Sequence, residues 1–85
     1  MLKVYAAQWC PHCRKTLEFL RKNKIEFEYY EIEEQDDETI RKIEEVNGGD
    51  DWRVPTLEYD GKWREGKVFD EISLRHDLTA MGLFK

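Results

Sequence analysis

Residues 9–13 read Trp-Cys-Pro-His-Cys (WCPHC), and they contain the only two cysteines of the chain, Cys10 and Cys13. Two cysteines at this spacing can form a structural disulfide, contribute half of a metal site or act as a redox couple. The spacing alone does not distinguish these three roles. The position of the pair relative to the neighbouring secondary structure is more informative.

The cysteines lie at the predicted junction of a strand and a helix. Residues 2–6 (LKVYA) form a short, largely apolar run that is typical of a buried strand, and from Pro11 to Leu20 apolar residues recur at helical spacing. Proline favours the first helical position because its missing N–H has no partner there in any case. The sequence therefore predicts Cys10 at the N-cap of a helix and Cys13 three residues further on.

This position predicts a reactive sulfur at Cys10. The free N–H groups of His12 and Cys13 are expected to point toward it, and the helix dipole adds partial positive charge, so both favour the thiolate. Cys13, one turn further in, is expected to attack a mixed disulfide held on Cys10. An imidazolium at His12 would stabilise the thiolate further. We therefore predict that Pro11 and His12 tune the couple to a potential above that of thioredoxin, which is about −270 mV.

The two other roles of the cysteine pair are less favoured. A disulfide that closes so short a loop removes little entropy from the unfolded chain. The N-terminus lacks the basic start and apolar core of a secretory signal, and structural disulfides are uncommon in the cytoplasm, where we expect this protein to be. A zinc site needs four ligands, and the chain holds only His12 and His76 besides its cysteines. We predict no metal site within one chain; a metal or cluster shared between two copies stays open as an alternative.

Composition limits the partners. Eighty-five residues, of which 40% are hydrophobic, are enough for one small domain over residues 1–85. The net charge is −5, and residues 26–51 carry twelve acidic side chains against two basic ones, which argues against a nucleic-acid-binding surface. No apolar run approaches the roughly 20 residues that span a bilayer. We expect a monomer that binds neither nucleic acid nor membrane.

The rest of the chain predicts alternating strands and helices. The remaining predicted elements are a strand over residues 25–32, a helix capped by Asp36 or Asp37, a β-hairpin over residues 54–63 with its turn at Asp60-Gly61, and a helix capped by Asp70. The order β-α-β-α-β-β-α predicts an α/β fold with a mixed four-stranded sheet.

On these landmarks the chain resembles the glutaredoxin family. WCPHC after the first strand, Val54-Pro55-Thr56 before a hairpin and Gly66 before the last helix match that family in order and approximate spacing. The resemblance implies the thioredoxin fold, with three helices flanking the sheet, Cys10 as attacking thiolate and Cys13 as resolving thiol. It also implies a cis peptide bond at Pro55 and a backbone at Val54 that pairs with substrate as a short added strand.

The resemblance implies a thiol–disulfide oxidoreductase that reduces protein or glutathione mixed disulfides, with no bound cofactor and with glutathione as co-substrate and reductant. Glutathione-using members usually carry a Gly-Gly pair followed closely by an acidic or hydroxyl residue, whereas here Gly66 is single and Asp70 lies four positions on. That spacing is similar to NrdH-type redoxins, which take electrons from thioredoxin reductase and donate them to ribonucleotide reductase. The tetrapeptide CPHC differs from that group and is like that of DsbA-type oxidants. An NrdH-like redoxin is the alternative function, and a binding module that holds a metal is a third.

Substrate contacts are expected around the cysteines. Gln8 offers an amide donor and Trp9 an apolar rim for docking, while Arg53, directly before Val54, offers a cation for a glutathione carboxylate. Asp70 is expected to act first as a helix cap and secondarily as a ligand contact. Arg14 and Lys67 are expected to be ordinary surface cations.

Overall fold

Strands and helices follow one another in the predicted order in the computed structural model, which describes residues 1–84. The elements are β1 (Leu2–Ala6), α1 (Pro11–Lys22), β2 (Phe27–Glu31), the 3-10 helix η1 (Ile32–Glu34), α2 (Asp37–Val46), β3 (Thr56–Tyr59), β4 (Lys62–Arg64) and α3 (Glu71–Ala80).

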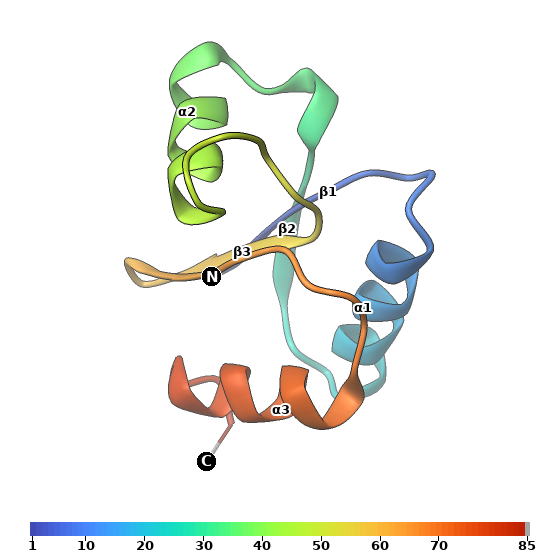
Figure 1. Ribbon diagram of the computed structural model, residues 1–85. Helices are drawn as coiled ribbons and strands as arrows, with labels where there is room; N and C mark the ends of the chain where they lie inside the picture. The colour runs from blue at the N-terminus through green and yellow to red at the C-terminus, as the bar shows by residue number, and fades with distance from the viewer. Residues whose placement is uncertain (85) are drawn as a thin grey trace.

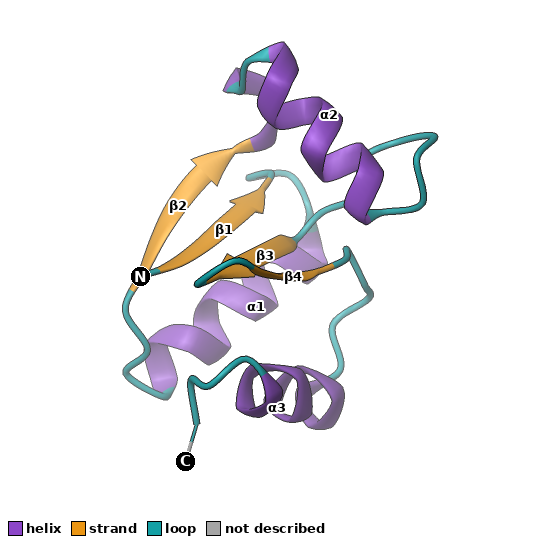
Figure 2. Cartoon of the chain, turned by 90° about the vertical axis from the view of Figure 1, so that its left-hand side faces the viewer, coloured by secondary structure: helices purple, strands orange, loops and turns teal. Residues whose placement is uncertain are grey.

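The strands form one mixed sheet in the order β2-β1-β3-β4. β1 runs parallel to β2, as expected for strands joined by a helical crossover, and antiparallel to β3, which forms a hairpin with β4. Helix α2 covers one face of the sheet, and α1 and α3 cover the other (Figures 1 and 2). The predicted mixed four-stranded sheet with three flanking helices is therefore confirmed.

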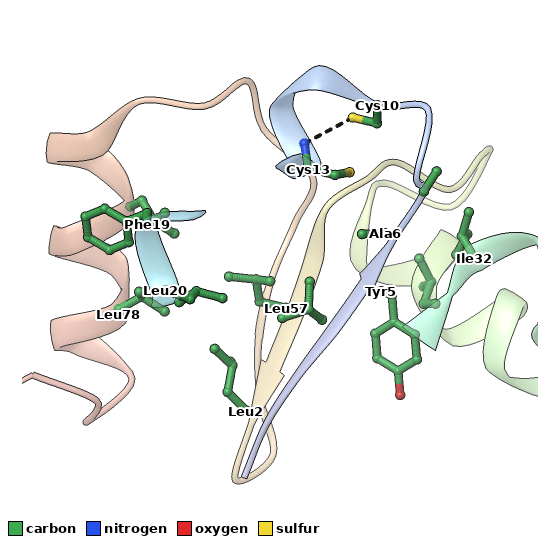
Figure 3. Close-up of a cluster of buried hydrophobic side chains, with 14 of the residues drawn as sticks. Leu2, Tyr5, Ala6, Cys10, Cys13, Phe19, Leu20, Ile32, Leu57 and Leu78 are labelled. Carbon is green, nitrogen blue, oxygen red and sulfur yellow. Dashed lines mark hydrogen bonds between the residues drawn. The ribbon is translucent and has the colours of Figure 1, made fainter. Parts of the chain in front are cut away.

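The two faces of the sheet have different cores. On the face of α1 and α3, fully buried aliphatic side chains pack together, among them Leu2, Leu20, Leu57 and Leu78 (Figure 3). Tyr5 points to the opposite face, where its ring stacks on those of Tyr30 at 5.2 Å and Trp63 at 6.0 Å. Each fully buried leucine contributes about 1.5–3 kcal/mol of transfer free energy, so the apolar face determines how α1 and α3 lie on the sheet.

The predicted strand over residues 25–32 is too long at both ends. Lys24 has a positive φ of 57°, and the Ile25 N–H donates to the Leu20 carbonyl at 2.9 Å, so Ile25 closes the end of α1 instead of joining β2. At the other end Ile32 is the first residue of η1. The prediction was too long because Ile25 and Ile32, which flank the strand, also pack against the core and so extend the apolar–acidic alternation beyond it.

The caps and turns were predicted more accurately. Asp36 is the N-cap of α2 and accepts a hydrogen bond from the Thr39 N–H at 2.8 Å. Asp60 and Gly61 both have positive φ, 52° and 80°, as the predicted hairpin turn requires. The predicted hairpin over residues 54–63 starts too early, however, because β3 begins only at Thr56, after the Val54–Pro55 bond.

A largely buried ion pair joins the sheet to α3. The Arg64 side chain on β4 is 5% exposed and donates through Nε to Asp77 Oδ2 at 2.7 Å, and Lys67 Nζ lies 3.2 Å from the same oxygen. Burial by itself would raise the pKa of Asp77, but the hydrogen bonds and charges of Arg64 and Lys67 outweigh it and hold that pKa below its usual value. The pair therefore stabilises the fold only while Asp77 is ionised.

Asp77→Asn is expected to lower the free energy of unfolding at pH 7 by about 1–3 kcal/mol, because Arg64 loses its charged partner and stays buried. The lowered pKa sets the sign of the pH dependence: the wild-type advantage is complete above the unfolded-state pKa of about 3.9 and disappears as the pH falls through the folded-state value. Urea denaturation at pH 7 and pH 3 measures both. Glu18→Gln, an exposed carboxylate in the middle of α1, is the control and should change stability by less than about 0.5 kcal/mol. An Asn variant as stable as wild type at pH 7 would show that the pair contributes nothing.

Candidate active site

Cys10 and Cys13 lie where the chain leaves β1 and enters α1. Cys10 has the extended backbone of an N-cap residue, and Pro11 is the first residue of the helix, as predicted. The Cys13 backbone N–H donates to Cys10 Sγ at 3.3 Å (Figure 3). The expected second donor, the His12 N–H, forms no such bond. Both thiols are free, with Cys10 6% and Cys13 1% exposed.

The environment of Cys13 keeps its thiol protonated. Burial is the main cause, and the hydrogen bond with the Cys10 side chain and the charge of Glu31 act in the same direction. Together they raise the pKa of Cys13 to about 12 against a lowering hydrogen bond with the backbone of Ala7. Near neutrality Cys13 is therefore a neutral thiol beside Cys10. The two sulfurs are chemically different, with Cys10 at the helix N-terminus and Cys13 shielded behind it.

Cys10 is expected to react selectively with iodoacetamide in the reduced, folded protein at pH 7. A thiol with a pKa of about 12 is ionised roughly three thousand times less often at pH 7 than an exposed cysteine with a pKa of about 8.5. Peptide mass spectrometry should find the label on Cys10, and on Cys13 only after unfolding in guanidinium. Equal labelling of both residues in the folded protein would contradict the difference between the sulfurs.

An open groove of about 550 Å³ lies beside Cys10. Three segments that are far apart in the sequence meet in it: the start of α1, the loop before β3 and the connection between β4 and α3. Its lining residues are Trp9, Cys10, His12, Trp52, Arg53, Val54, Gly66, Lys67 and Val68. The structure thus brings together five of the residues that the sequence singled out. It also places Lys67 in the groove wall, where the sequence predicted an ordinary surface cation.

The loop before β3 presents Val54 to this groove. The Val54–Pro55 peptide bond is cis, as predicted, and Pro55 is fully buried. Within residues 1–84 neither the N–H nor the carbonyl of Val54 takes part in a hydrogen bond. Val54 therefore has free backbone groups at the edge of the groove.

A buried asparagine holds two walls of the groove together. The Asn47 side chain, 7% exposed, donates to Thr56 Oγ1 at 3.0 Å and accepts from the Gly66 N–H at 2.7 Å. Thr56 Oγ1 in turn donates to the Arg53 carbonyl at 2.6 Å. By its local sequence, Asn47 before Gly48 and Gly49 indicates only the end of a helix. Its second role depends on contacts with residues 9 and 19 positions away, which a local pattern does not reveal.

Gly66→Ala is expected to distort the groove. A Cβ at this position would lie 2.5 Å from Arg53 Cβ and 2.7 Å from the Arg53 carbonyl carbon, so the backbone itself has to move. We expect a loss of about 1–3 kcal/mol in the free energy of unfolding and a raised KM for disulfide substrates. Urea denaturation and steady-state kinetics measure the two effects. Glu65→Ala, at the exposed neighbouring position, is the control, and a Gly66→Ala protein with wild-type stability and KM would show that the close approach is unimportant.

A second hollow, lined mainly by acidic residues, lies next to the groove and shares Trp9 with it. This hollow is lined by Gln8, Trp9, Tyr29, Glu31, Glu33 and Glu34. Trp9 is 59% exposed, and its indole N–H donates to Glu33 Oε1 at 2.7 Å, which holds the ring between hollow and groove. Gln8 does not line the groove, and its backbone N–H donates to Glu31 Oε1 at 3.2 Å; the expected ligand contact of its side chain stays a prediction.

Glu31 was missed in the sequence, where it is one acid among many. Its Oε1 also accepts from the Tyr29 hydroxyl at 3.0 Å, and burial together with this bond raises the pKa of Tyr29. Glu31 Oε2 is buried without a hydrogen-bond partner in the described part of the chain. Nothing in the sequence separates Glu31 from its acidic neighbours, because its role comes from the parallel pairing of β2 with β1.

His12 and Asp70 interact with backbone groups at the start of α3. His12 Nδ1 accepts a hydrogen bond from the Phe69 N–H at 3.0 Å, across 57 residues of sequence. Asp70 is the N-cap of α3, as predicted, and its Oδ1 accepts from the N–H groups of Ile72 and Ser73 at 3.0 and 3.4 Å. Asp70 does not line the groove.

Residues 1–84 contain many carboxylates besides the two cysteines and two histidines. No group of three or more histidine, cysteine, aspartate or glutamate side chains is arranged to hold a metal ion there. Among these same residues, no helix has the length and apolarity needed to cross a bilayer.

A dithiol at a helix N-terminus, beside a buried cis-proline loop on a four-stranded sheet, defines a redox protein of the thioredoxin fold. Comparison with known structures agrees: a glutaredoxin from Archaeoglobus fulgidus superposes with a TM-score of 0.68 at 29% identity, over 88% of this chain and 82% of that one. The thioredoxin-like protein BC3987 gives a TM-score of 0.67 at 24% identity, over 89% of this chain and 97% of its own, and supports the fold.

Sequence comparison identifies the family. The sequence model of the glutaredoxin family matches residues 2–63. An uncharacterised glutaredoxin-like 8.6 kDa protein from the rubredoxin operon of Clostridium pasteurianum is 32% identical over 65 residues, which are 72% of this chain and 77% of that protein. The chain belongs to the glutaredoxin family, and it is a glutaredoxin-like redox protein.

Proposed function

We propose that the protein is a dithiol glutaredoxin, a thiol–disulfide oxidoreductase that reduces protein disulfides and glutathione mixed disulfides through Cys10 and Cys13. The observation that carries the proposal is the difference between the two sulfurs. Cys10 lies at a helix N-terminus and lines the groove, and its Sγ accepts a hydrogen bond from the Cys13 N–H. Cys13 is instead fully buried, and its pKa is raised to about 12.

In the first step the Cys10 thiolate attacks one sulfur of the substrate disulfide. A new S–S bond forms between Cys10 and the substrate, and the other substrate sulfur leaves as a thiolate that takes up a proton. The free backbone groups of Val54 can pair with the extended substrate beside the bond under attack, and Trp9 offers an apolar contact on the other side of Cys10.

In the second step Cys13 loses its proton and attacks Cys10 Sγ. The substrate leaves as a second thiol, and a Cys10–Cys13 disulfide remains, so the two electrons of the dithiol have moved to the substrate. Ionising Cys13 is unfavourable in the free protein because of its burial. The mixed disulfide removes the Cys10 thiolate, whose charge is one of the causes that raise the pKa of Cys13, and thereby favours this step.

Glutathione is the proposed reductant. One glutathione thiolate attacks the Cys10–Cys13 disulfide and forms a mixed disulfide with Cys10, and a second releases oxidised glutathione and restores the dithiol. Glutathione carries two carboxylates, and the groove lining within residues 1–84 includes two basic side chains, Arg53 and Lys67, and no acidic one. This charge supports binding of an anionic tripeptide beside Cys10.

Replacing either cysteine should separate the two steps. Cys10→Ser is expected to abolish disulfide reduction, because no nucleophile remains at the groove. Cys13→Ser is expected to abolish turnover of protein disulfides while it traps mixed disulfides on Cys10 and preserves reduction of glutathione mixed disulfides. Turnover coupled to glutathione reductase, together with mass spectrometry of the trapped species, distinguishes these outcomes. Residual turnover by Cys10→Ser would overturn the assignment of the nucleophile.

The NrdH-like function is the second candidate, and the environment of Asp70 favours it. Asp70 lies outside the groove, and its Oδ1 is already engaged in capping α3, so only its other carboxylate oxygen is left for the γ-glutamyl end of glutathione. In that case thioredoxin reductase would supply the electrons, and ribonucleotide reductase would be one acceptor. Comparing thioredoxin reductase with glutathione plus its reductase as electron sources for the same disulfide peptide decides between the two.

A further inference from the structure

The segment from Gly66 to Phe69 forms one wall of the groove, and it has no regular secondary structure of its own. Lys67 and Val68, in its middle, are both exposed. A hydrogen bond holds each end: the Gly66 N–H donates to Asn47 Oδ1 at 2.7 Å, and the Phe69 N–H donates to His12 Nδ1 at 3.0 Å. The second bond is the one that connects this wall directly to the CPHC turn.

The second bond requires a particular chemical state of His12. An imidazole nitrogen accepts a hydrogen bond only when it carries no proton, so Nδ1 is unprotonated and the ring proton of the neutral form is on Nε2. Turning the ring over would place a C–H group against the Phe69 N–H, so the observed orientation is the one that satisfies that donor. A second proton would go onto Nδ1 and remove the acceptor.

We propose that His12 is a positioning residue: its neutral imidazole, through Nδ1, holds the Gly66–Phe69 wall against Cys10 and so sets the width of the substrate groove. This role rests on the proposed thiol–disulfide exchange. It differs from the imidazolium expected from the sequence, because it requires an acceptor atom and no positive charge.

The two roles predict different effects for two substitutions. In His12→Asn the side-chain oxygen occupies nearly the place of Nδ1 and retains the acceptor, but the variant lacks a titratable group. In His12→Leu the side chain has a similar volume but offers neither a hydrogen-bond acceptor nor a titratable group. A positioning role therefore predicts rescue by Asn of the defect that Leu causes, whereas a role through charge predicts the same defect in both variants. His76→Leu, on the exposed side of α3, is the matched control.

Nuclear magnetic resonance tests the hydrogen bond without any substrate. In the wild-type protein at pH 7.5, the ring nitrogens of His12 should show the neutral form with its proton on Nε2. The Phe69 amide should exchange with solvent about tenfold faster in His12→Leu than in wild type, and about as slowly in His12→Asn as in wild type. An imidazolium, a proton on Nδ1, or unprotected Phe69 exchange in wild type would overturn the proposal, even if the Leu variant failed to fold.

Kinetics test the consequence for the groove. His12→Leu should raise KM for a disulfide peptide about fivefold with a smaller change in kcat, and His12→Asn should recover most of that loss. The equilibrium constant for oxidation by glutathione disulfide should stay within about twofold of wild type in the Asn variant. A tenfold shift of that constant in both variants with unchanged KM would overturn the positioning role. If wild type itself reduced no disulfide, the proposed function would fail, and the Phe69 measurements would still decide whether His12 holds the wall.

Discussion

The hydrogen bond from the Cys13 N–H to Cys10 Sγ is the interaction on which the proposed chemistry of the site depends. It exists because Cys10 is an N-cap, and Cys10 is an N-cap because Pro11 begins α1 at that point. A sulfur thereby occupies the place that a serine or aspartate oxygen usually takes at a helix start. The same geometry puts Cys13 one turn inside the helix, against the core, where burial keeps it protonated. Local helix capping thus gives the two sulfurs different environments.

A nucleophile at a helix terminus becomes selective only if a defined surface surrounds it. Two loops form most of that surface, the one before β3 and the Gly66–Phe69 segment. Polar side chains from α1 and from the end of α2 hold both loops in place. Asn47, at the end of α2, binds the loop before β3 through Thr56 and the opposite wall through Gly66. His12 binds the same wall at Phe69. The groove is therefore built by hydrogen bonds between distant elements, whereas apolar packing builds the sheet and helices beneath it.

These two kinds of interaction explain how much the sequence could predict. The order of elements, the caps at Asp36 and Asp70 and the N-cap position of Cys10 follow from patterns within a few residues, and the structure confirms them. Contacts such as that of Asn47 with Gly66 span many residues and arise from topology, so no local pattern signals them. The same limit applies to Glu31 and to the acceptor role of His12. Strand ends were predicted poorly because inward-facing isoleucines continue the apolar pattern into the turns.

The wall of the groove also connects the active site to the stability of the fold. The Gly66–Phe69 segment joins β4 to α3, and the Arg64–Asp77 pair holds these two elements together just behind it. Lys67 takes part in both structures, since it lines the groove and its Nζ lies 3.2 Å from Asp77. A movement of α3 away from β4 would therefore draw Phe69 away from His12 and open the groove beside Cys10. The largely buried ion pair therefore fixes α3 against β4, and the His12–Phe69 bond fixes the segment before α3 against the start of α1.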